Sequence, residues 1–352
     1  MKLFKNWIIG VLLGFLIFSG LIVIFNYSID SFNLFNKSNN NIGKYLKDGY
    51  FITGDNISSN RVNNIYEAMI KDMKKVDVLA IGSSRTILLH KKLLFNNKKV
   101  IYYNFTDGTA QLKHYAKIIG LFNKYDVKLP KNIILGIDPW VFDNKASISQ
   151  IKRLINNKNK DKSKYLQLYN FEYTIINLKS IFNKKKIKKS KNLKNLLNIN
   201  NKNMIISPNA DMYYPISKYN MDINKLMKSI DDGLKRCDET NYNTKCVKYD
   251  KLNNFNILKY FINYLRSKGV NIIIYFSPFE PIFFNHIVRY NNFSTYNELI
   301  VNFCAENKLK VIGSYNPYDY KLRSEQFLDG IHPKESAIKI IFKNSLIKNI
   351  KY

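Results

Sequence analysis

Several polar residues in this 352-residue sequence stand at the ends of short apolar runs, where side chains from distant segments can meet. Ser84 follows Gly82 and Ser83 at the end of one run, and Asp329 precedes His332 by three residues near the end of the chain. A hydroxyl, an imidazole and a carboxylate are the nucleophile, base and orienting group of serine acyl transfer. Ser84, His332 and Asp329 are therefore the candidate catalytic residues. Ser83 is the alternative nucleophile, because a shift of one residue would exchange the two serines.

Further residues near the same run ends could complete such a site. Gly108 lies in a turn, and we expect the backbone N–H groups of Ser84 and Gly108 to stabilise an oxyanion. We expect Arg85 to hold an internal carboxylate, with binding of an anionic substrate as the alternative. Asp138 and Trp140 are expected to line the cleft, where Trp140 would belong either to the core or to a surface that stacks on sugars.

A repeating pattern of apolar runs and amphipathic segments must position these residues. Strands are predicted at 76–81, 100–104, 131–137, 271–276 and 310–312. Helices are predicted at 56–75, 111–123, 251–268, 291–307 and 334–350. Strands that alternate with helices predict a flavodoxin-like three-layer α/β/α fold with a five-stranded parallel sheet. In such a sheet, ligands bind at the carboxyl ends of the strands, where the candidate residues stand.

Residues 7–25 form an uninterrupted apolar run without a charge. As a helix the run would extend about 28 Å, close to the ~30 Å thickness of the hydrocarbon core of a membrane. Lys2 and Lys5 precede it, which predicts a cytoplasmic stub at 1–6 and an extracytoplasmic location for the rest of the chain. A cleavable signal peptide is the alternative, but the run is long for one and no Ala-x-Ala site follows. We therefore expect an uncleaved, single-pass anchor.

The remaining chain is predicted to be a linker and one domain with a long insertion. Residues 26–56 are rich in Asn, Ser and Gly and are interpreted as a juxtamembrane linker that leads to an entry strand, with the domain at 57–352. Residues 144–250 lie between the third and fourth strands and are interpreted as an inserted cap. Cys237 and Cys246 lie within the insertion, and the sequence leaves open whether they form a disulfide.

The composition limits the classes of partner and cofactor. The chain has 56 Lys and Arg against 26 Asp and Glu, a formal net charge of +30, and 46% hydrophobic residues, too many for a disordered chain. Its four His and three Cys residues, with no Cys-x-x-Cys pair, exclude a zinc finger, and we expect neither a metal nor a cofactor. His90, His114 and His286 have no evident catalytic partners and are expected at the surface or on helices. Outside the cell the positive charge favours anionic lipids or polymers rather than nucleic acid.

Together these motifs resemble the SGNH (GDSL-like) hydrolase and acyltransferase superfamily. Gly82-Ser83-Ser84 is similar to its first block, with Ser83 in place of Asp, and Gly108 is similar to the glycine of its second block. Asp329-x-x-His332 is similar to its last block, whereas Gly136-Ile137-Asp138 lacks the Asn of its third. The anchor and the Gly-Ser-Ser opening resemble membrane-anchored members, which include the D-alanyl-lipoteichoic acid transfer proteins and the exopolysaccharide O-acetyltransferases.

This resemblance implies a Ser-His-Asp esterase or acyltransferase that acts on a polysaccharide or polymer of the cell envelope. Its partners would be an acyl donor, a glycan or polymer acceptor and a multipass membrane acyltransferase that delivers the acyl group. The alternative function is that of a catalytically inactive, membrane-tethered module that binds or scaffolds an anionic envelope polymer. The missing third-block Asn and the basic composition are the reasons for considering it.

Overall fold

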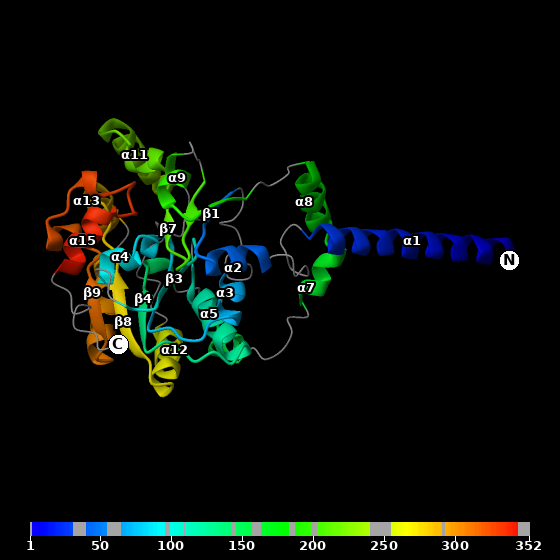
Figure 1. The fold of residues 1–352 in the computed structure, drawn as a ribbon, viewed down its shortest axis with the longest axis horizontal. Coiled ribbons are helices and arrows are strands. Elements are labelled where there is room, and N and C mark those ends of the chain that lie inside the picture. Colours follow the sequence, from blue (N-terminus) through cyan, green and yellow to red (C-terminus); the bar gives the residue numbers. More distant parts are fainter. Residues whose placement is uncertain are drawn as a thin grey trace.

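The computed structural model describes residues 2–30, 40–54, 65–95, 99–108, 110–141, 146–156, 163–182, 187–198, 203–239, 255–290 and 293–343. One long helix, α1, extends away from the other elements, which pack around two β-sheets (Figure 1). The larger sheet is parallel, and the smaller one is antiparallel.

The larger sheet has five strands in the order β3-β2-β4-β8-β9, and every neighbouring pair is parallel. All residues of β2 and β4 are buried, as expected for parallel strands that are covered on both faces. If these five strands are numbered by their place in the chain, the order across the sheet is 2-1-3-4-5, which is the flavodoxin-like order. The predicted fold class is therefore confirmed. The strands are β2 Val78–Gly82, β3 Tyr102–Thr106, β4 Asn132–Gly136, β8 Asn271–Phe276 and β9 Lys310–Gly313.

Helices pack on both faces of this sheet (Figure 1). On one face α5 packs against α6, α6 contacts α12, and Phe255 of α12 stacks on Phe303 of α14. On the other face α4 and α15 contact each other, and α15 also contacts β9. These helices are α4 Lys91–Phe95, α5 Leu112–Lys124, α6 Ile148–Ile155, α12 Phe255–Ser267, α14 Phe293–Glu306 and α15 Glu335–Lys343.

Several segments differ from the predicted helices, and α4 is one that the sequence pattern does not predict. The helix predicted at 56–75 is represented, within its described part, by the short helix α3 Glu67–Lys71. An additional helix, α13 Pro281–Tyr290, lies where the sequence pattern predicts none. Its first residue is a proline, which the first turn of a helix tolerates because an N–H there has no partner within the helix. A proline in this position therefore begins α13 rather than ending an element.

The smaller sheet joins the predicted linker to the predicted insertion. Its strand order is β5-β1-β6-β7, and the pairs are antiparallel. β1 comes from the segment interpreted as linker and entry strand, and the other three strands come from the insertion. With two or three residues each, these strands are too short to show an alternating pattern in the sequence. They are β1 Phe51–Thr53, β5 Lys188–Ser190, β6 Ile205–Ile206 and β7 Met212–Tyr213.

The insertion also contains helices, and one further helix precedes β1. The helices of the insertion besides α6 are α7 Ser163–Leu166, α8 Phe171–Phe182, α9 Leu193–Asn198, α10 Ile216–Tyr219 and α11 Ile223–Glu239. Helix α2 Asn40–Lys47 precedes β1. The question of a disulfide between Cys237 and Cys246 lies outside the described residues, because neither side chain is described.

Among the described residues, one helix is long and apolar enough to cross a membrane. α1 covers Lys2–Ile29, and its apolar part, Phe4–Ile29, is 26 residues long with a mean hydropathy of 2.9 in its most apolar window. That window is not buried against the rest of the protein. The helix is longer than the predicted segment 7–25 and includes the first residues of the predicted linker.

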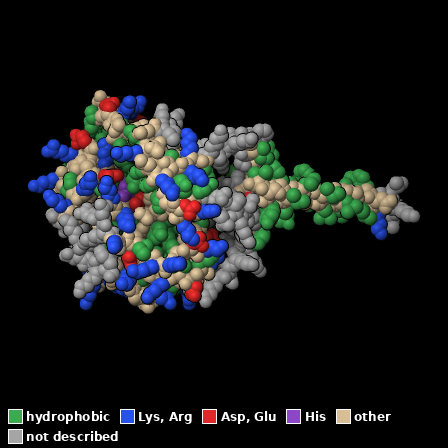
Figure 2. Space-filling model, viewed as in Figure 1, with side chains coloured by type: hydrophobic (Ala, Val, Ile, Leu, Met, Phe, Trp, Pro, Cys, Tyr) green, Lys and Arg blue, Asp and Glu red, His purple; other side chains and the backbone are tan. Residues whose placement is uncertain are grey.

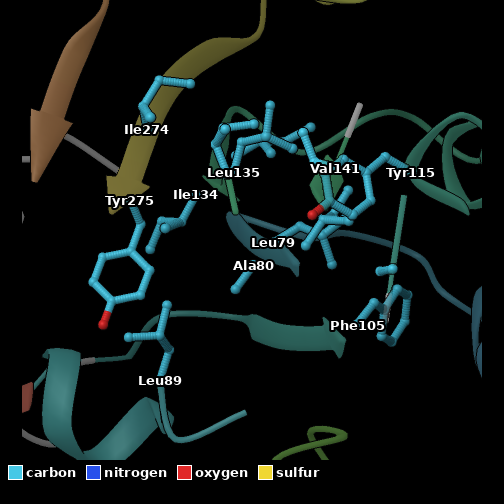
Figure 3. Packing of buried hydrophobic residues seen from close by; sticks show 14 of the residues in the cluster. Leu79, Ala80, Leu89, Phe105, Tyr115, Ile134, Leu135, Val141, Ile274 and Tyr275 are labelled. Atoms are coloured by element: carbon cyan, nitrogen blue, oxygen red, sulfur yellow. The ribbon is translucent and has the colours of Figure 1, made fainter. Parts of the chain in front are cut away.

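The core lies mainly between the central sheet and its helices. Figure 3 shows side chains of β2, β4 and β8 packed with Tyr115 from α5 and with Leu89, which precedes α4. The Tyr115 hydroxyl donates a hydrogen bond to the carbonyl of Gly136 at 2.7 Å, so this buried polar group is satisfied at the end of β4. The backbone of α5 also comes close to α6, because a Cβ at Gly120 would lie 2.1 Å from the carbonyl oxygen of Leu154.

This close approach predicts that Gly120→Ala destabilises the fold. The clash is with backbone, which cannot rotate away, so we expect the free energy of unfolding to fall by about 1–3 kcal/mol. Gly233→Ala on α11 is the matched control, since its Cβ would only touch Phe283 at 3.9 Å. There alanine should be neutral or stabilising by up to about 1 kcal/mol. Urea unfolding of the two variants measures the difference, and equal effects would contradict the close contact.

Candidate active site

The turn after β2 presents Ser84 at the edge of the central sheet. Ser83 begins the 3₁₀-helix η3 Ser84–Thr86, and its hydroxyl accepts a hydrogen bond from the N–H of Arg85 at 3.2 Å. The Thr86 side chain folds over two neighbouring strand ends, where a Cβ at Gly82 would lie 2.4 Å from Thr86 Oγ1 and a Cβ at Gly136 would lie 2.2 Å from Thr86 Cγ2. Glycine at these two positions therefore allows the tight turn that carries Ser84.

A second loop, which precedes α15, presents His332. The Asp329 carboxylate accepts hydrogen bonds from the backbone N–H groups of Ile331 at 3.0 Å and His332 at 3.1 Å, and so shapes this loop. The same carboxylate lies 2.8 Å from the Nδ1 atom of His332. Because an ionised carboxylate only accepts hydrogen bonds, Nδ1 carries the proton and Nε2 is left as an acceptor.

The structure brings Ser84 and His332 together across 248 positions of sequence. The distance between Ser84 Oγ and His332 Nε2 is 2.8 Å. With Asp329 on the other side of the imidazole, the three side chains form one hydrogen-bonded series, as in a serine hydrolase triad. The side chains of His332 and Asp329 are 16% and 24% exposed, so the series is open to solvent.

Ser83 faces a different partner. Its side chain is fully buried and donates a hydrogen bond to the Asp138 carboxylate. Of the two serines that the sequence offers as nucleophile, Ser84 is thus the one whose hydroxyl meets the imidazole.

Arg85 is buried next to the hydrogen-bonded side chains of Ser84, His332 and Asp329, and its guanidinium joins several chain segments. Its Nη1 atom lies 3.1 Å from Asp138 Oδ1, its Nε donates to the carbonyl of Ile331 at 3.1 Å, and its Nη2 donates to the carbonyl of Ser277. The guanidinium also lies over the ring of Phe279, 3.9 Å from its centre. Arg85 therefore holds an internal carboxylate, one of the two roles considered from the sequence.

The three side chains predicted near the cleft are not available to a ligand in this structure. Arg85, Asp138 and Trp140 are 1%, 2% and 5% exposed, and Trp140 belongs to the hydrophobic core. The physical reason is that these side chains pack on one another: Arg85 pairs with Asp138, and its guanidinium lies over the ring of Trp140, which belongs to the 3₁₀-helix η4 Pro139–Val141. Burial raises the pKa of Asp138, although the charge of Arg85 and the hydroxyl of Ser83 oppose that shift.

The two backbone groups predicted as oxyanion donors are engaged within the protein. The N–H of Ser84 donates to the carbonyl of Gly108 at 2.8 Å, and the N–H of Gly108 donates to Asp107 Oδ1 at 2.9 Å. The loop that carries Gly108 thus closes onto the turn that carries Ser84. In this conformation neither N–H points at a vacant oxyanion position, contrary to the expectation from the sequence.

The insertion contributes a residue that the sequence does not indicate. Tyr214 directly follows β7, and its ring makes an edge contact with His332, with 6.1 Å between ring centres. The sheet formed by β1, β5, β6 and β7 positions this tyrosine, so its place beside the imidazole depends on pairing between distant segments. Neither its neighbours nor its spacing in the sequence predicts this contact.

A cavity of about 510 Å³ lies close to the loop that carries His332 and precedes α15. Its walls come from α4, from the insertion and from the beginning of α15, and include Leu93, Leu197, Tyr213, Tyr219, Lys334 and Glu335. Apolar walls with a few charged groups are typical of pockets for small ligands.

His90 lies in the wall of this cavity. It is buried and precedes α4, so it lies neither at the surface nor on a helix, the two positions expected for it. Its Nε2 lies 2.8 Å from the carbonyl oxygen of Met212, and its Nδ1 lies 3.3 Å from Glu335 Oε1. Burial alone would lower the pKa of His90, but Glu335 and Asp211 raise it overall. Burial raises the pKa of the neighbouring Asp211 to about 6, although His90 opposes that shift.

The described residues do not form a metal centre. Within the described ranges, no group of three or more His, Cys, Asp or Glu side chains could hold a metal ion. What the residues near Ser84 offer is a nucleophile, a base and an orienting carboxylate.

Comparisons with known proteins add little to this geometry. No protein-family model matches the chain, and no curated protein matches it. Among solved structures, a crystal structure provisionally described as an acylhydrolase, from Bacteroides fragilis NCTC 9343, aligns with 79% of this chain and 91% of its own, with 9% identity and a TM-score of 0.35. A likeness this weak shows no shared function, so a function for this protein rests on the geometry of its own site.

The contacts of Arg85 predict that even a conservative substitution is costly. Arg85→Lys keeps the charge but loses the planar arrangement of donors that reaches both Ile331 and Ser277. We expect a loss of about 2–4 kcal/mol in the free energy of unfolding, because buried carbonyl groups lose their donors. Arg289→Lys, at an exposed position on α13, is the matched control and should change stability by less than about 0.5 kcal/mol. Chemical unfolding measures both, and similar small effects would contradict the role of Arg85.

The raised pKa of Asp211 predicts a pH-dependent stability. Between its unfolded value of 3.8 and its folded value of about 6, Asp211 binds more proton in the folded state, so stability is lost as the pH rises through this range. Asp211→Asn removes this titration. We expect the stability of the wild type relative to the variant to fall by about 2 kcal/mol between pH 4 and 6. Urea unfolding at several pH values measures it, and a difference independent of pH would contradict the assignment.

Proposed function

We propose that this protein is a membrane-anchored, extracytoplasmic serine esterase or acyltransferase of the SGNH type, acting on a polysaccharide or polymer of the cell envelope. The observation that carries the proposal is the 2.8 Å contact between Ser84 Oγ and His332 Nε2, with Asp329 on the opposite nitrogen of the same ring. This order of hydroxyl, imidazole and carboxylate is what general-base activation of a serine requires.

In the proposed reaction, Ser84 Oγ attacks the carbonyl carbon of an acyl donor while its proton passes to His332 Nε2. The carboxylate of Asp329 stabilises the imidazolium that forms. His332 then gives the proton to the leaving group as the carbonyl–leaving-group bond breaks, which leaves the acyl group on Ser84. Water or a hydroxyl of the acceptor polymer, deprotonated by His332, releases the acyl group and restores the serine. The chemistry needs neither a metal nor a cofactor.

An oxyanion site has to form during this reaction. In the structure the N–H of Ser84 is bonded to the carbonyl of Gly108. A shift of the loop at 107–108 would free this N–H and that of Gly108 for the developing negative charge. Substrate binding would supply the energy for that exchange.

Charge and location support the proposed substrate class. α1 would anchor the protein with Lys2 and Lys5 on the cytoplasmic side. Figure 2 shows Lys and Arg side chains spread over the visible face of the domain, in keeping with the net charge of +30. Such a surface attracts anionic envelope polymers. A multipass membrane acyltransferase would be the source of the acyl group in the transfer reaction.

The experiment is to react the full-length protein, in detergent or vesicles, with a fluorophosphonate probe and with an activated acetyl ester. Ser84→Ala should abolish covalent labelling and lower ester turnover by about 10³-fold or more, because the nucleophile is lost. Ser83→Ala is the matched control. It removes the hydrogen bond to Asp138 but should retain labelling at Ser84. Labelling and turnover that survive in Ser84→Ala would contradict the assignment.

A second candidate function is a catalytically inactive, tethered module that binds anionic polymer. The engagement of both predicted oxyanion donors within the protein favours it. The same labelling experiment separates the two functions, because a scaffold should form no adduct that depends on Ser84.

A further inference from the structure

Two short elements and a helix of the insertion expose a cluster of large apolar side chains. They are α7, the 3₁₀-helix η5 Gln167–Tyr169 and α8. The exposed side chains range from 39% to 74% exposed, and we call them the juxtamembrane face: Tyr165, Leu166, Tyr169, Phe171, Ile175, Leu178 and Ile181. A cluster of this kind on a soluble protein marks a surface that contacts something else.

The orientation of α8 is the reverse of that expected for a helix on a soluble core. Phe171, Ile175 and Leu178 recur at spacings of four and three residues, so they lie along one side of the helix, and all three are exposed. Another side carries Tyr173 and Asn177, which are buried. The helix therefore packs through a side with polar groups and turns its apolar side outward.

Buried polar contacts attach these elements to the end of α1. Asn26 Nδ2 donates to the carbonyl of Leu168 and to Thr174 Oγ1, both at 2.8 Å, and Asn177 Nδ2 donates to Asn26 Oδ1 at 2.9 Å. Asn26 and Asn177 are fully buried. A buried network whose members satisfy one another holds a defined geometry.

At Asp30, the residue that directly follows α1, the carboxylate Oδ1 accepts a hydrogen bond from the Tyr173 hydroxyl at 2.7 Å. Asp30 is 1% exposed. Together with the Asn26 contacts, this bond sets the position of the juxtamembrane face relative to the axis of α1.

This position coincides with the expected boundary of the membrane. A helix of 26 residues, Phe4–Ile29, extends about 39 Å, which exceeds the ~30 Å of hydrocarbon and places its last residues among lipid headgroups. In Figure 1, α8 and α7 flank that end of α1 on opposite sides and run across its direction. Figure 2 shows hydrophobic side chains gathered around this junction, beside the tail formed by α1.

We propose that the juxtamembrane face inserts into the lipid leaflet at which α1 ends, so that α7, η5 and α8 form a second, interfacial contact with the membrane. The inference rests on α1 as a membrane anchor, which is part of the proposed function. Lipid is the partner that the position indicates, because a face fixed at headgroup level beside a spanning helix meets lipid first. Tyr165 and Tyr169 suit this depth, where aromatic rings with a polar end are favoured.

The contact would restrict the motion of the domain. A single spanning helix leaves a domain free to rotate about the helix axis and to tilt. A second contact spread over α7 to α8 removes that freedom and keeps the loops that carry Ser84 and His332 at a constant orientation to the membrane surface.

The test places an environment-sensitive fluorescent amino acid at single positions of the full-length protein in vesicles of zwitterionic and anionic phospholipid. At position 175 or 178 we expect blue-shifted emission, quenching by lipids that carry a quencher near the headgroup, and protection from an aqueous quencher. Position 299 is the matched control, since Leu299 is an exposed apolar residue on α14, and it should behave as aqueous. Position 13, within α1, reports separately on the anchor.

The outcomes distinguish failure of this inference from failure of the anchor. Lipid quenching at position 13 together with aqueous behaviour at 175 and 178 would overturn the interfacial contact and leave the anchor intact. Aqueous behaviour at position 13 would overturn the anchor and this inference with it. Protection at 175 in native membranes but not in vesicles of lipid alone would assign the face to a protein partner and would also overturn the proposal. The Ser84 labelling experiment is independent of all three.

Discussion

The pairing of a buried guanidinium with a buried carboxylate determines how the candidate site is assembled. A charge in the interior is tolerated only when it is neutralised and its donors are satisfied. Arg85 meets both conditions by binding Asp138 after β4 and the carbonyls of Ser277 after β8 and Ile331 beside the imidazole. These bonds require several chain segments to converge on the residue next to Ser84. The contact between Ser84 and His332, 248 positions apart, follows from that convergence.

The parts of the fold that the sequence predicts are those specified by local pattern. β8 is a continuous apolar run with the predicted bounds, and the parallel order follows from alternating strands and helices. The candidate triad could be proposed because strand ends of a parallel sheet share one edge. β6, with two residues, and the contact of Tyr214 with His332 depend on long-range pairing, which leaves no local signal. The hydrogen bond from Ser84 N–H to Gly108 is likewise a matter of loop conformation that residue types do not determine.

The three side chains of the candidate triad have the geometry that the proposed reaction needs, whereas the backbone oxyanion donors do not. The hydroxyl, imidazole and carboxylate already lie at hydrogen-bonding distances, so proton transfer needs no rearrangement. The oxyanion donors are bonded within the protein, which protects polar groups that would otherwise be unsatisfied in the absence of an acyl group. An enzyme with this division would react fastest with acyl donors whose binding displaces the loop at 107–108.

The small sheet has a mechanical consequence for a tethered protein. β1 lies between β5 and β6, so the polypeptide that leaves the tether is clamped on both edges before it continues to β2. A pull along the tether, from flow or from a polymer strand held by the domain, would load the hydrogen bonds of β1 first. Those bonds run across the strand and would resist together in shear. The five-stranded sheet and the loops that carry Ser84 and His332 would thus be shielded from force that arrives through α1.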